Sequence, residues 1–191
     1  MMISNNLFSL ENKTALVTGG STGLGLMATA GLAAAGAKVF IVSRKLENCE
    51  KAANKINNCN FKGQVVPFKG DLSSEAGISN IVNELHKKNS ELHVLVNNAG
   101  RTWGSNFGSF PYDAWEKVLN LNVSALFHLT QKLVPLLAAS AEQDSPTRVI
   151  NIGSVMGEVP MGDGAYSYAA SKSAVHHITK ILAKELAQKN I

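Results

Sequence analysis

The sequence has few cysteines, few aromatic side chains and little charge. Its 191 residues include two cysteines, 6% aromatic residues and 17% charged residues, against 45% hydrophobic residues. Cys49 and Cys59 form no C-x-x-C pair and have no His cluster beside them, so neither a disulfide scaffold nor a metal site is expected, and both should be free thiols. The low charge and the apolar content exclude a disordered chain and predict a packed core.

Long apolar runs and concentrated positive charge are also missing. No apolar run approaches the ~20 residues needed to cross a bilayer, so no membrane partner is expected. Residues 1–11 lack the basic start and the apolar core of a signal peptide, which favours a cytoplasmic protein. The net charge is +4, but the longest basic run is Lys87-Lys88. Nucleic-acid binders gather Lys and Arg on one face, so a nucleic-acid partner is not expected.

The chain does contain five short apolar runs that alternate with longer segments of helical periodicity. Each run is continuous rather than alternating, as in parallel strands covered on both faces. The runs are 15–17, 39–42, 65–68, 94–96 and 149–152, and the helical segments are 24–36, 45–58, 74–89, 113–139 and 166–189. This alternation predicts right-handed βαβ units and an α/β fold, a doubly wound Rossmann-type parallel sheet with helices on both faces. No linker or repeat interrupts residues 1–191, so one domain is expected.

Two details of this scheme are specific enough to test. Asp113 and Glu116 fit a capping box at the start of the fourth helical segment. The fifth strand is expected at an edge of the sheet, where backbone groups stay unpaired.

A glycine-rich turn joins the first strand to the first helix, at residues 18–25. One glycine permits a tight turn, one lets the backbone approach a pyrophosphate, and one lets the helix pack closely on the strand. Phosphates then meet backbone N–H groups and the positive end of the helix dipole. An ordinary loop is the alternative. The expected dinucleotide-binding residues are Gly19, Ser21, Thr22, Gly23, Leu24 and Gly25.

The end of the second strand favours NADP(H) over NAD(H). An NAD site usually has an acidic residue there to bind the ribose 2′-hydroxyl, but this chain has Ser43, Arg44 and Lys45. The Ser43 hydroxyl and the Arg44 guanidinium are suited to a 2′-phosphate. The alternative is that Arg44 is a surface residue at the start of a helix.

Polar and small residues follow the third and fourth strands. The Asp71 carboxylate, beside Leu72, is placed to accept from an adenine amino group, and Asn98, Ala99 and Gly100 are placed beneath a ribose. Either segment alone is compatible with turn chemistry. Together they stand at carboxyl ends of consecutive strands, where open α/β sheets bind ligands.

Tyr168 and Lys172 lie four residues apart in the last helical segment and therefore share a face. A tyrosine of ordinary pKa, near 10, is a poor base at neutral pH, but a neighbouring ammonium and an oxidised nicotinamide favour the phenolate. Tyr166 points to nearly the opposite face. Ser154, after the fifth strand, is either a turn residue or a donor to a substrate oxygen. Asn122 is interpreted as a buried amide that binds backbone groups, as part of a proton path to Lys172, or as both.

In this ordered set of motifs the sequence resembles the short-chain dehydrogenase/reductase family, over essentially the whole chain. The matching pieces are residues 18–25, Asp71, residues 97–100, Asn122, Ser154 and residues 168–172. The resemblance implies that Tyr168 donates or accepts the proton and also contacts the cofactor, while Ser154 orients the carbonyl. It further implies that Lys172 lowers the tyrosine pKa while binding the nicotinamide ribose, and that Asn122 completes a tetrad. Residues 97–104 and 164–172 look closest to 3-oxoacyl reductase-like members of the rhamnolipid-pathway type. The resemblance also implies a homodimer or homotetramer in the full-length form, while His176 and His177 are interpreted as packing or interface residues.

The resemblance also implies a sixth strand, a mobile substrate loop and a seventh strand, which residues 1–191 do not include, so a form truncated after the fifth helix is expected. Two hypotheses result. One is an NADP(H)-dependent enzyme that acts on a small-molecule carbonyl or secondary alcohol. The other is a truncated, non-catalytic chain that binds cofactor. A nucleotide-binding regulator is disfavoured, because it would have no use for the Ser–Tyr–Lys set.

Overall fold

The structure is a computed structural model that describes residues 7–89 and 91–191; the first six residues of the segment assessed for a signal peptide lie outside the described part. Five parallel strands form one sheet in the order β3-β2-β1-β4-β5. The strands are β1 (Thr14–Thr18), β2 (Lys38–Ser43), β3 (Gln64–Lys69), β4 (Val94–Asn97) and β5 (Arg148–Asn151). The order reverses between β1 and β4, as in a doubly wound sheet, so the predicted Rossmann-type fold is confirmed. The predicted edge position of β5 is confirmed as well.

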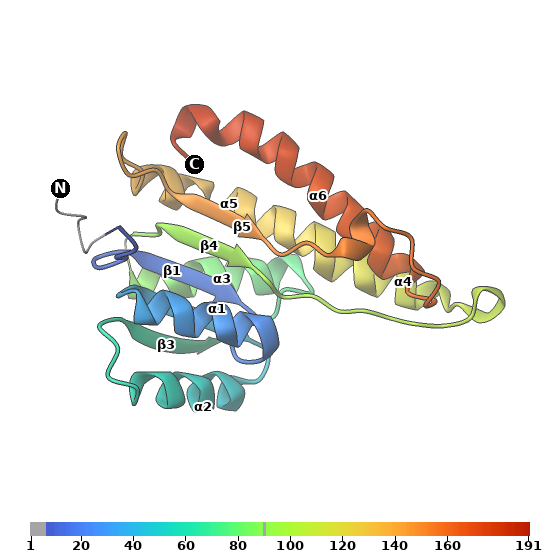
Figure 1. Ribbon diagram of the computed structural model, residues 1–191, viewed down its shortest axis with the longest axis horizontal. Coiled ribbons are helices and arrows are strands. Elements are labelled where there is room, and N and C mark those ends of the chain that lie inside the picture. Colours follow the sequence, from blue (N-terminus) through green and yellow to red (C-terminus); the bar gives the residue numbers. More distant parts are fainter. Residues whose placement is uncertain (1–6, 90) are drawn as a thin grey trace.

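Helices connect the strands on both sides of the sheet (Figure 1). The α-helices are α1 (Gly23–Ala34), α2 (Leu46–Asn57), α3 (Glu75–Lys88), α4 (Tyr112–Leu119), α5 (Ala125–Ala139) and α6 (Tyr166–Leu186). Single turns are η1 (Phe107–Ser109), η2 (Asn120–Ser124), η3 (Val155–Gly157) and η4 (Ala187–Lys189). Except at the fourth segment, the helices match the predicted ones within about three residues at either end.

The core is divided between the two faces because successive side chains of a strand point to opposite sides. On one face Leu16 and Leu95 belong to a cluster with Leu85 of α3 and Leu133 of α5, all fully buried. On the other face Val17 belongs to a cluster with residues of α1 and α2. Since both faces are covered, the central strands are apolar throughout, which is why their runs are continuous in the sequence.

The fourth helical segment differs from the prediction in two ways. It is interrupted by η2, a π-helical turn in which one extra residue per turn changes the direction of the side chains. The predicted capping box is wrong, because the helix begins after Pro111 and no side chain caps it. Asp113 lies inside the first turn and forms an ion pair with Lys117 four residues later. An acidic residue in the first turn complements the helix dipole without capping it.

Candidate active site

Glycine geometry brings the β1–α1 turn close to the end of β4. Gly19 and Gly23 have φ of 64° and 53°, a backbone region that residues other than glycine rarely adopt. Gly25 makes the closest approach, since a Cβ there would lie 2.3 Å from the Gly19 carbonyl oxygen and 2.4 Å from Asn98 Nδ2. The turn therefore has no space for a side chain at residue 25.

The first turn of α1 has backbone donors without a side-chain acceptor. Thr22 is the extended N-cap residue, but its side chain forms no capping hydrogen bond, and no acidic residue lies in the first turn. In α3, by contrast, the Ser74 hydroxyl accepts from the Gly77 N–H at 3.1 Å. Leu24 is 65% exposed at the same end of α1. An uncapped helix N-terminus of this kind is suited to an anion such as a phosphate.

Side chains that sequence reasoning did not select hold this turn in place. Thr29 Oγ1 lies 3.1 Å from the Gly20 carbonyl oxygen and 2.8 Å from that of Gly25. Thr18 Oγ1 accepts the N–H groups of Asn98 and Ala99, both at 3.0 Å. Only the hydrogen bond from Thr29 to Gly25 could have been predicted from the sequence, because a threonine in a helix often donates to the carbonyl four residues earlier.

The carboxyl ends of β2 and β3 carry an oppositely charged pair of residues. Asp71 Oδ1 accepts the Ser73 N–H at 2.9 Å. This backbone hydrogen bond, together with the smaller attraction of the Arg44 guanidinium, holds the pKa of the Asp71 carboxyl below its usual value. Arg44 and Asp71 are both exposed, as a ligand site requires, whereas Leu72 is half-buried and packs against the core.

The Ser43 hydroxyl, which the sequence predicted to bind a 2′-phosphate, already has partners within the chain. Its Oγ donates to the Lys45 carbonyl oxygen at 3.1 Å and lies 3.1 Å from Cys49 Sγ. The predicted contact between Ser43 and a 2′-phosphate would require the hydroxyl to leave the Lys45 carbonyl or to accept from a protonated phosphate oxygen.

Lys172 and Tyr168 come together at the end of β5. The Lys172 side chain is buried, and its Nζ donates to the Ile152 carbonyl oxygen at 2.5 Å. The same Nζ lies 5.6 Å from the centre of the Tyr168 ring. Burial lowers the pKa of Lys172 from its ordinary value. The expected shared face of the two side chains is therefore observed, one helical turn apart.

Ser154 begins η3, directly after β5. Its Oγ accepts the Met156 N–H at 3.3 Å, an arrangement typical of a serine at the start of a short turn. A hydroxyl has two acceptor sites and one donor, so this bond leaves the O–H free to donate. The turn interpretation and the substrate-donor interpretation are therefore compatible.

Asn122 lies in the π-helical turn and crosses to the segment after β4. Its Oδ1 accepts the Arg101 N–H at 2.9 Å, and its Nδ2 donates to the Arg101 carbonyl oxygen at 2.9 Å. Nδ2 also lies 2.9 Å from Ser171 Oγ, which in turn donates to the Tyr168 carbonyl oxygen at 2.7 Å. Asn122 thus connects three segments of the site, and its interpretation as a buried amide that binds backbone groups is consistent with this geometry.

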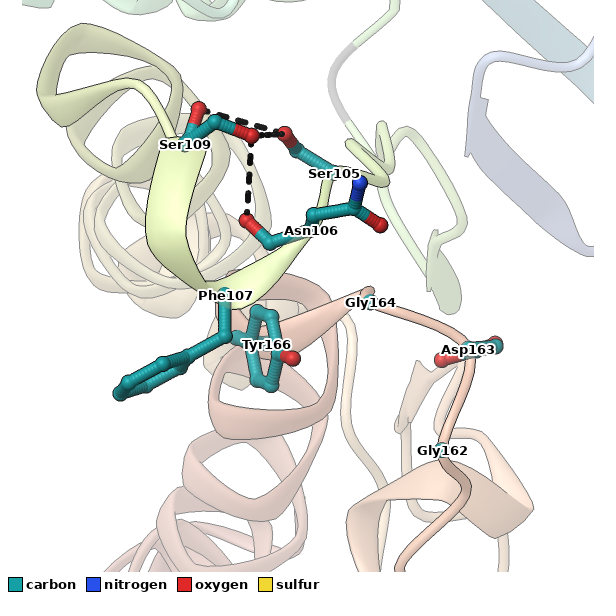
Figure 2. Close-up of a pocket in the computed structure, with 8 residues that line it drawn as sticks. All are labelled: Ser105, Asn106, Phe107, Ser109, Gly162, Asp163, Gly164 and Tyr166. Carbon is teal, nitrogen blue, oxygen red and sulfur yellow. Dashed lines mark hydrogen bonds between the residues drawn. The ribbon is translucent and has the colours of Figure 1, made fainter.

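Tyr166 belongs to a different environment. Its ring makes edge contacts with Phe107 and Phe110, at centroid distances of 5.8 Å and 5.7 Å. Figure 2 shows Tyr166 beside Phe107 at a cavity that lies between the segments following β4 and β5 and has a volume of about 550 Å³. Ser105 N–H donates to the Gly164 carbonyl oxygen at 3.2 Å and joins the two segments. Tyr166, rather than Tyr168, lines this cavity.

The arrangement of a glycine turn, charged strand ends and a Tyr–Lys pair agrees with a comparison with known families. The family model described as short chain dehydrogenase matches residues 13–191. The chain belongs to the short-chain dehydrogenase family. It is therefore an oxidoreductase, and the resemblance found in the sequence is confirmed.

Individual relatives of this short-chain dehydrogenase act on different substrates according to their names. It is 46% identical over 184 residues to the rhamnolipids biosynthesis 3-oxoacyl-(acyl-carrier-protein) reductase of Pseudomonas aeruginosa, covering 96% of this chain and 71% of that protein. It is 33% identical over 187 residues to the 5-keto-D-gluconate 5-reductase of Escherichia coli, covering 98% and 71%. The RhlG/NADP active-site complex of Pseudomonas aeruginosa matches with a TM-score of 0.92 at 45% identity, covering 98% of this chain and 72% of that one.

Within residues 7–89 and 91–191, no group of three or more His, Cys, Asp or Glu side chains is arranged to hold a metal ion. None of the helices in that part of the chain is long and apolar enough to cross a membrane.

Asn122 gives a first prediction for the short-chain dehydrogenase. Asn122→Ala removes two hydrogen bonds to the Arg101 backbone and one to Ser171, and each such bond contributes about 0.5–1.5 kcal/mol. We expect the melting temperature to fall by about 5 °C or more in calorimetry. Asn120→Ala, in the same turn, removes one exposed hydrogen bond to Ser73 and should change it little. Equal melting temperatures for the two variants would contradict the connecting role of Asn122.

Proposed function

We propose that this short-chain dehydrogenase binds NADP(H) and transfers a hydride between its nicotinamide and a carbonyl or secondary alcohol substrate. The observation that carries the proposal is the buried Lys172 amine, placed by the Ile152 carbonyl beside the Tyr168 ring at the end of β5. When bound, the dinucleotide supplies or accepts the hydride; the residues of the chain bind it, orient the substrate and move the proton.

The residues of the β1–α1 turn fit a dinucleotide. A Cβ at Gly25 would fill the space where the turn is tightest, and the first turn of α1 has no side-chain cap. Gly19, Ser21, Thr22, Gly23, Leu24 and Gly25 would hold the pyrophosphate through backbone donors and the helix dipole. Asp71 and Leu72 would contact the adenine, and Asn98, Ala99 and Gly100 the ribose.

The preference for NADP(H) rests on Arg44. The carboxyl end of β2 has this exposed guanidinium and no carboxylate, so it favours a 2′-phosphate over a 2′-hydroxyl. Two similar structures that contain NADP support this: the RhlG complex, and a 3-oxoacyl (acyl-carrier-protein) reductase of Agrobacterium tumefaciens with a TM-score of 0.87 at 26% identity.

Arg44→Ala should separate the two cofactors. A hydrogen bond to a charged group contributes about 1.5–3 kcal/mol, so NADPH affinity should fall about 10- to 100-fold while NADH affinity stays unchanged. Fluorescence titration of the purified chain measures both. Lys45→Ala is the matched control at the neighbouring exposed position. An equal loss of affinity for NADPH and NADH would show that Arg44 does not recognise the 2′-phosphate.

The catalytic roles follow from donor and acceptor chemistry. In the direction of reduction, the Tyr168 O–H donates its proton to the substrate oxygen while the hydride reaches the carbonyl carbon, so an alcohol forms; oxidation is the reverse. The Lys172 ammonium favours the phenolate that remains, because an opposite charge nearby stabilises it. The Ser154 O–H donates to the same oxygen as negative charge develops there. Asn122 holds the segment after β4 against α6, through Arg101 and Ser171.

The experiment that tests this proposal is NADPH oxidation by the purified chain with carbonyl compounds of the kinds named for the relatives, a 3-oxoacyl thioester and 5-keto-D-gluconate. We expect absorbance loss that depends on enzyme and substrate. Cofactor binding without turnover of either carbonyl would instead favour the non-catalytic alternative.

A further inference from the structure

The imidazole of His176 lies one helical turn after Lys172, beneath the segment that carries Ser154. Its Nε2 accepts the backbone N–H of Ser154 at 3.3 Å. On the opposite side of the ring, Nδ1 is buried and lies 3.4 Å from Glu158 Oε1. This is a contact with a carboxylate rather than a hydrogen bond, because Nδ1 has no hydrogen-bond partner among the residues that the structure describes. His176 thus contacts both ends of η3.

Two glycines make space for this ring. A Cβ at Gly153 would lie 2.3 Å from His176 Nε2, and a Cβ at Gly157 would lie 2.8 Å from its Cε1. Real Cβ atoms do not approach so closely, so any larger residue at either position would displace the imidazole or the η3 segment. The ring therefore fills a slot formed by the backbone on both sides of Ser154.

The contacts determine where the proton of a neutral ring lies. A backbone N–H can only donate, so Nε2 must offer its lone pair to Ser154. The ring proton of the neutral form is then on Nδ1, directed toward the side where Glu158 lies. A proton on Nε2 would place two donors face to face and break the contact with Ser154.

We propose that His176 is a positioning residue that fixes the backbone of Ser154 and, through it, the direction of the Ser154 O–H toward the substrate. The proposal rests on the catalytic role proposed for Ser154. Three hydrogen bonds hold that serine: its N–H donates to His176, while Met156 N–H donates to its Oγ and Gly157 N–H donates to its carbonyl oxygen. Without the first, Ser154 is held only by N–H groups of η3, the turn that it begins, and no longer by α6. A displacement of about 1 Å in a reacting group can cost about 10²-fold in rate.

Nitrogen NMR of the histidine-labelled chain tests the positioning without any need for activity. We expect the neutral imidazole of His176 to carry its proton on Nδ1 and not on Nε2. His176→Leu, which removes the acceptor, should shift the Ser154 amide resonance, and His176→Gln, whose side-chain oxygen reaches a similar position, should restore most of that shift. A proton on Nε2, or a Ser154 amide unaffected by His176→Leu, would overturn the proposal.

Kinetics then tests whether the positioning acts through Ser154. His176→Leu should lower kcat about tenfold or more while the KM for NADPH is unchanged, and His176→Gln should recover most of the loss. In a Ser154→Ala background, His176→Leu should cause no further loss. A further loss in that background would show that His176 acts on something else. If neither parent nor variant turns over a carbonyl, the proposed function fails, while the NMR result still decides the positioning.

His177→Leu is the matched control, because His177 is the next residue of α6 and is exposed. It should leave both the Ser154 amide and kcat unchanged. Calorimetry of all variants distinguishes the proposed effect from unfolding: His176→Leu must lose kcat at temperatures where its melting curve shows it folded. If kcat stayed at the parental value in the folded variant, the proposal would be wrong.

Discussion

Tyr168→Phe should reduce kcat by about 10²- to 10⁴-fold, the range that a positioned acid or base contributes. The substitution removes one oxygen and keeps the ring, so the contact between the Lys172 amine and the ring face is retained. The hydroxyl also gives up one hydrogen bond to the nicotinamide ribose, worth about 0.5–1.5 kcal/mol, so NADPH affinity should fall no more than about tenfold. Initial rates of NADPH oxidation and fluorescence titration measure the two effects separately.

Tyr166→Phe is the matched control, two residues away on the same helix. The ring of Tyr166 lines the cavity and contacts Phe107 and Phe110, and those contacts need no hydroxyl. Its kcat should match that of the parent. Loss of activity in Tyr166→Phe with retention in Tyr168→Phe would reverse the assignment of the proton donor.

Gly25→Ala should abolish most cofactor binding. The new methyl group would lie 2.3 Å from the Gly19 carbonyl oxygen and 2.4 Å from Asn98 Nδ2, and the latter is held by hydrogen bonds to Thr18 and Gly19. The turn must open, which costs about 1–3 kcal/mol of stability as in other overpacked sites. It also displaces the backbone donors of α1. Loss of two charge-assisted hydrogen bonds corresponds to about 10²-fold or more in the Kd for NADPH.

Gly31→Ala is the control for this effect, because Gly31 lies in the same helix and a Cβ there would meet nothing within 4 Å. It should bind NADPH like the parent. Its free energy of unfolding should rise by about 0.5–1 kcal/mol, because alanine has a higher helix propensity than glycine. Calorimetric titration and thermal melting measure both variants. Unchanged NADPH affinity in Gly25→Ala would show that the dinucleotide binds elsewhere.

Much of the fold was predictable because the strands are buried on both faces. Leu16 and Val17 point to opposite faces, and both faces are covered by helices, so the runs are continuous in the sequence. The break at η2 was not predictable. A π-helical turn depends on the tertiary contacts of Asn122 with Arg101 and Ser171, and the local sequence continues the helical pattern through it.

The part of the candidate site that was predictable consists of side chains whose own chemistry and spacing indicate a catalytic role. The four-residue spacing of Tyr168 and Lys172 places them on one face, and the structure brings them together. Side chains that form hydrogen bonds with the backbone of other segments could not be recognised from the sequence pattern. Thr29 and His176 bind carbonyl or N–H groups of the two turns that carry the site, and only the folded arrangement shows which turn each one reaches.

The central claim is that a dinucleotide over the glycine turn meets the Tyr168–Lys172 pair at the end of β5. A crystal structure of the chain with bound NADP⁺ tests this most directly. We expect a 2′-phosphate at Arg44, a pyrophosphate at the start of α1, and a nicotinamide ribose within hydrogen-bond distance of the Tyr168 hydroxyl and Lys172 Nζ. A dinucleotide bound away from the carboxyl ends of the strands, or a Tyr168 hydroxyl directed away from the nicotinamide, would contradict it.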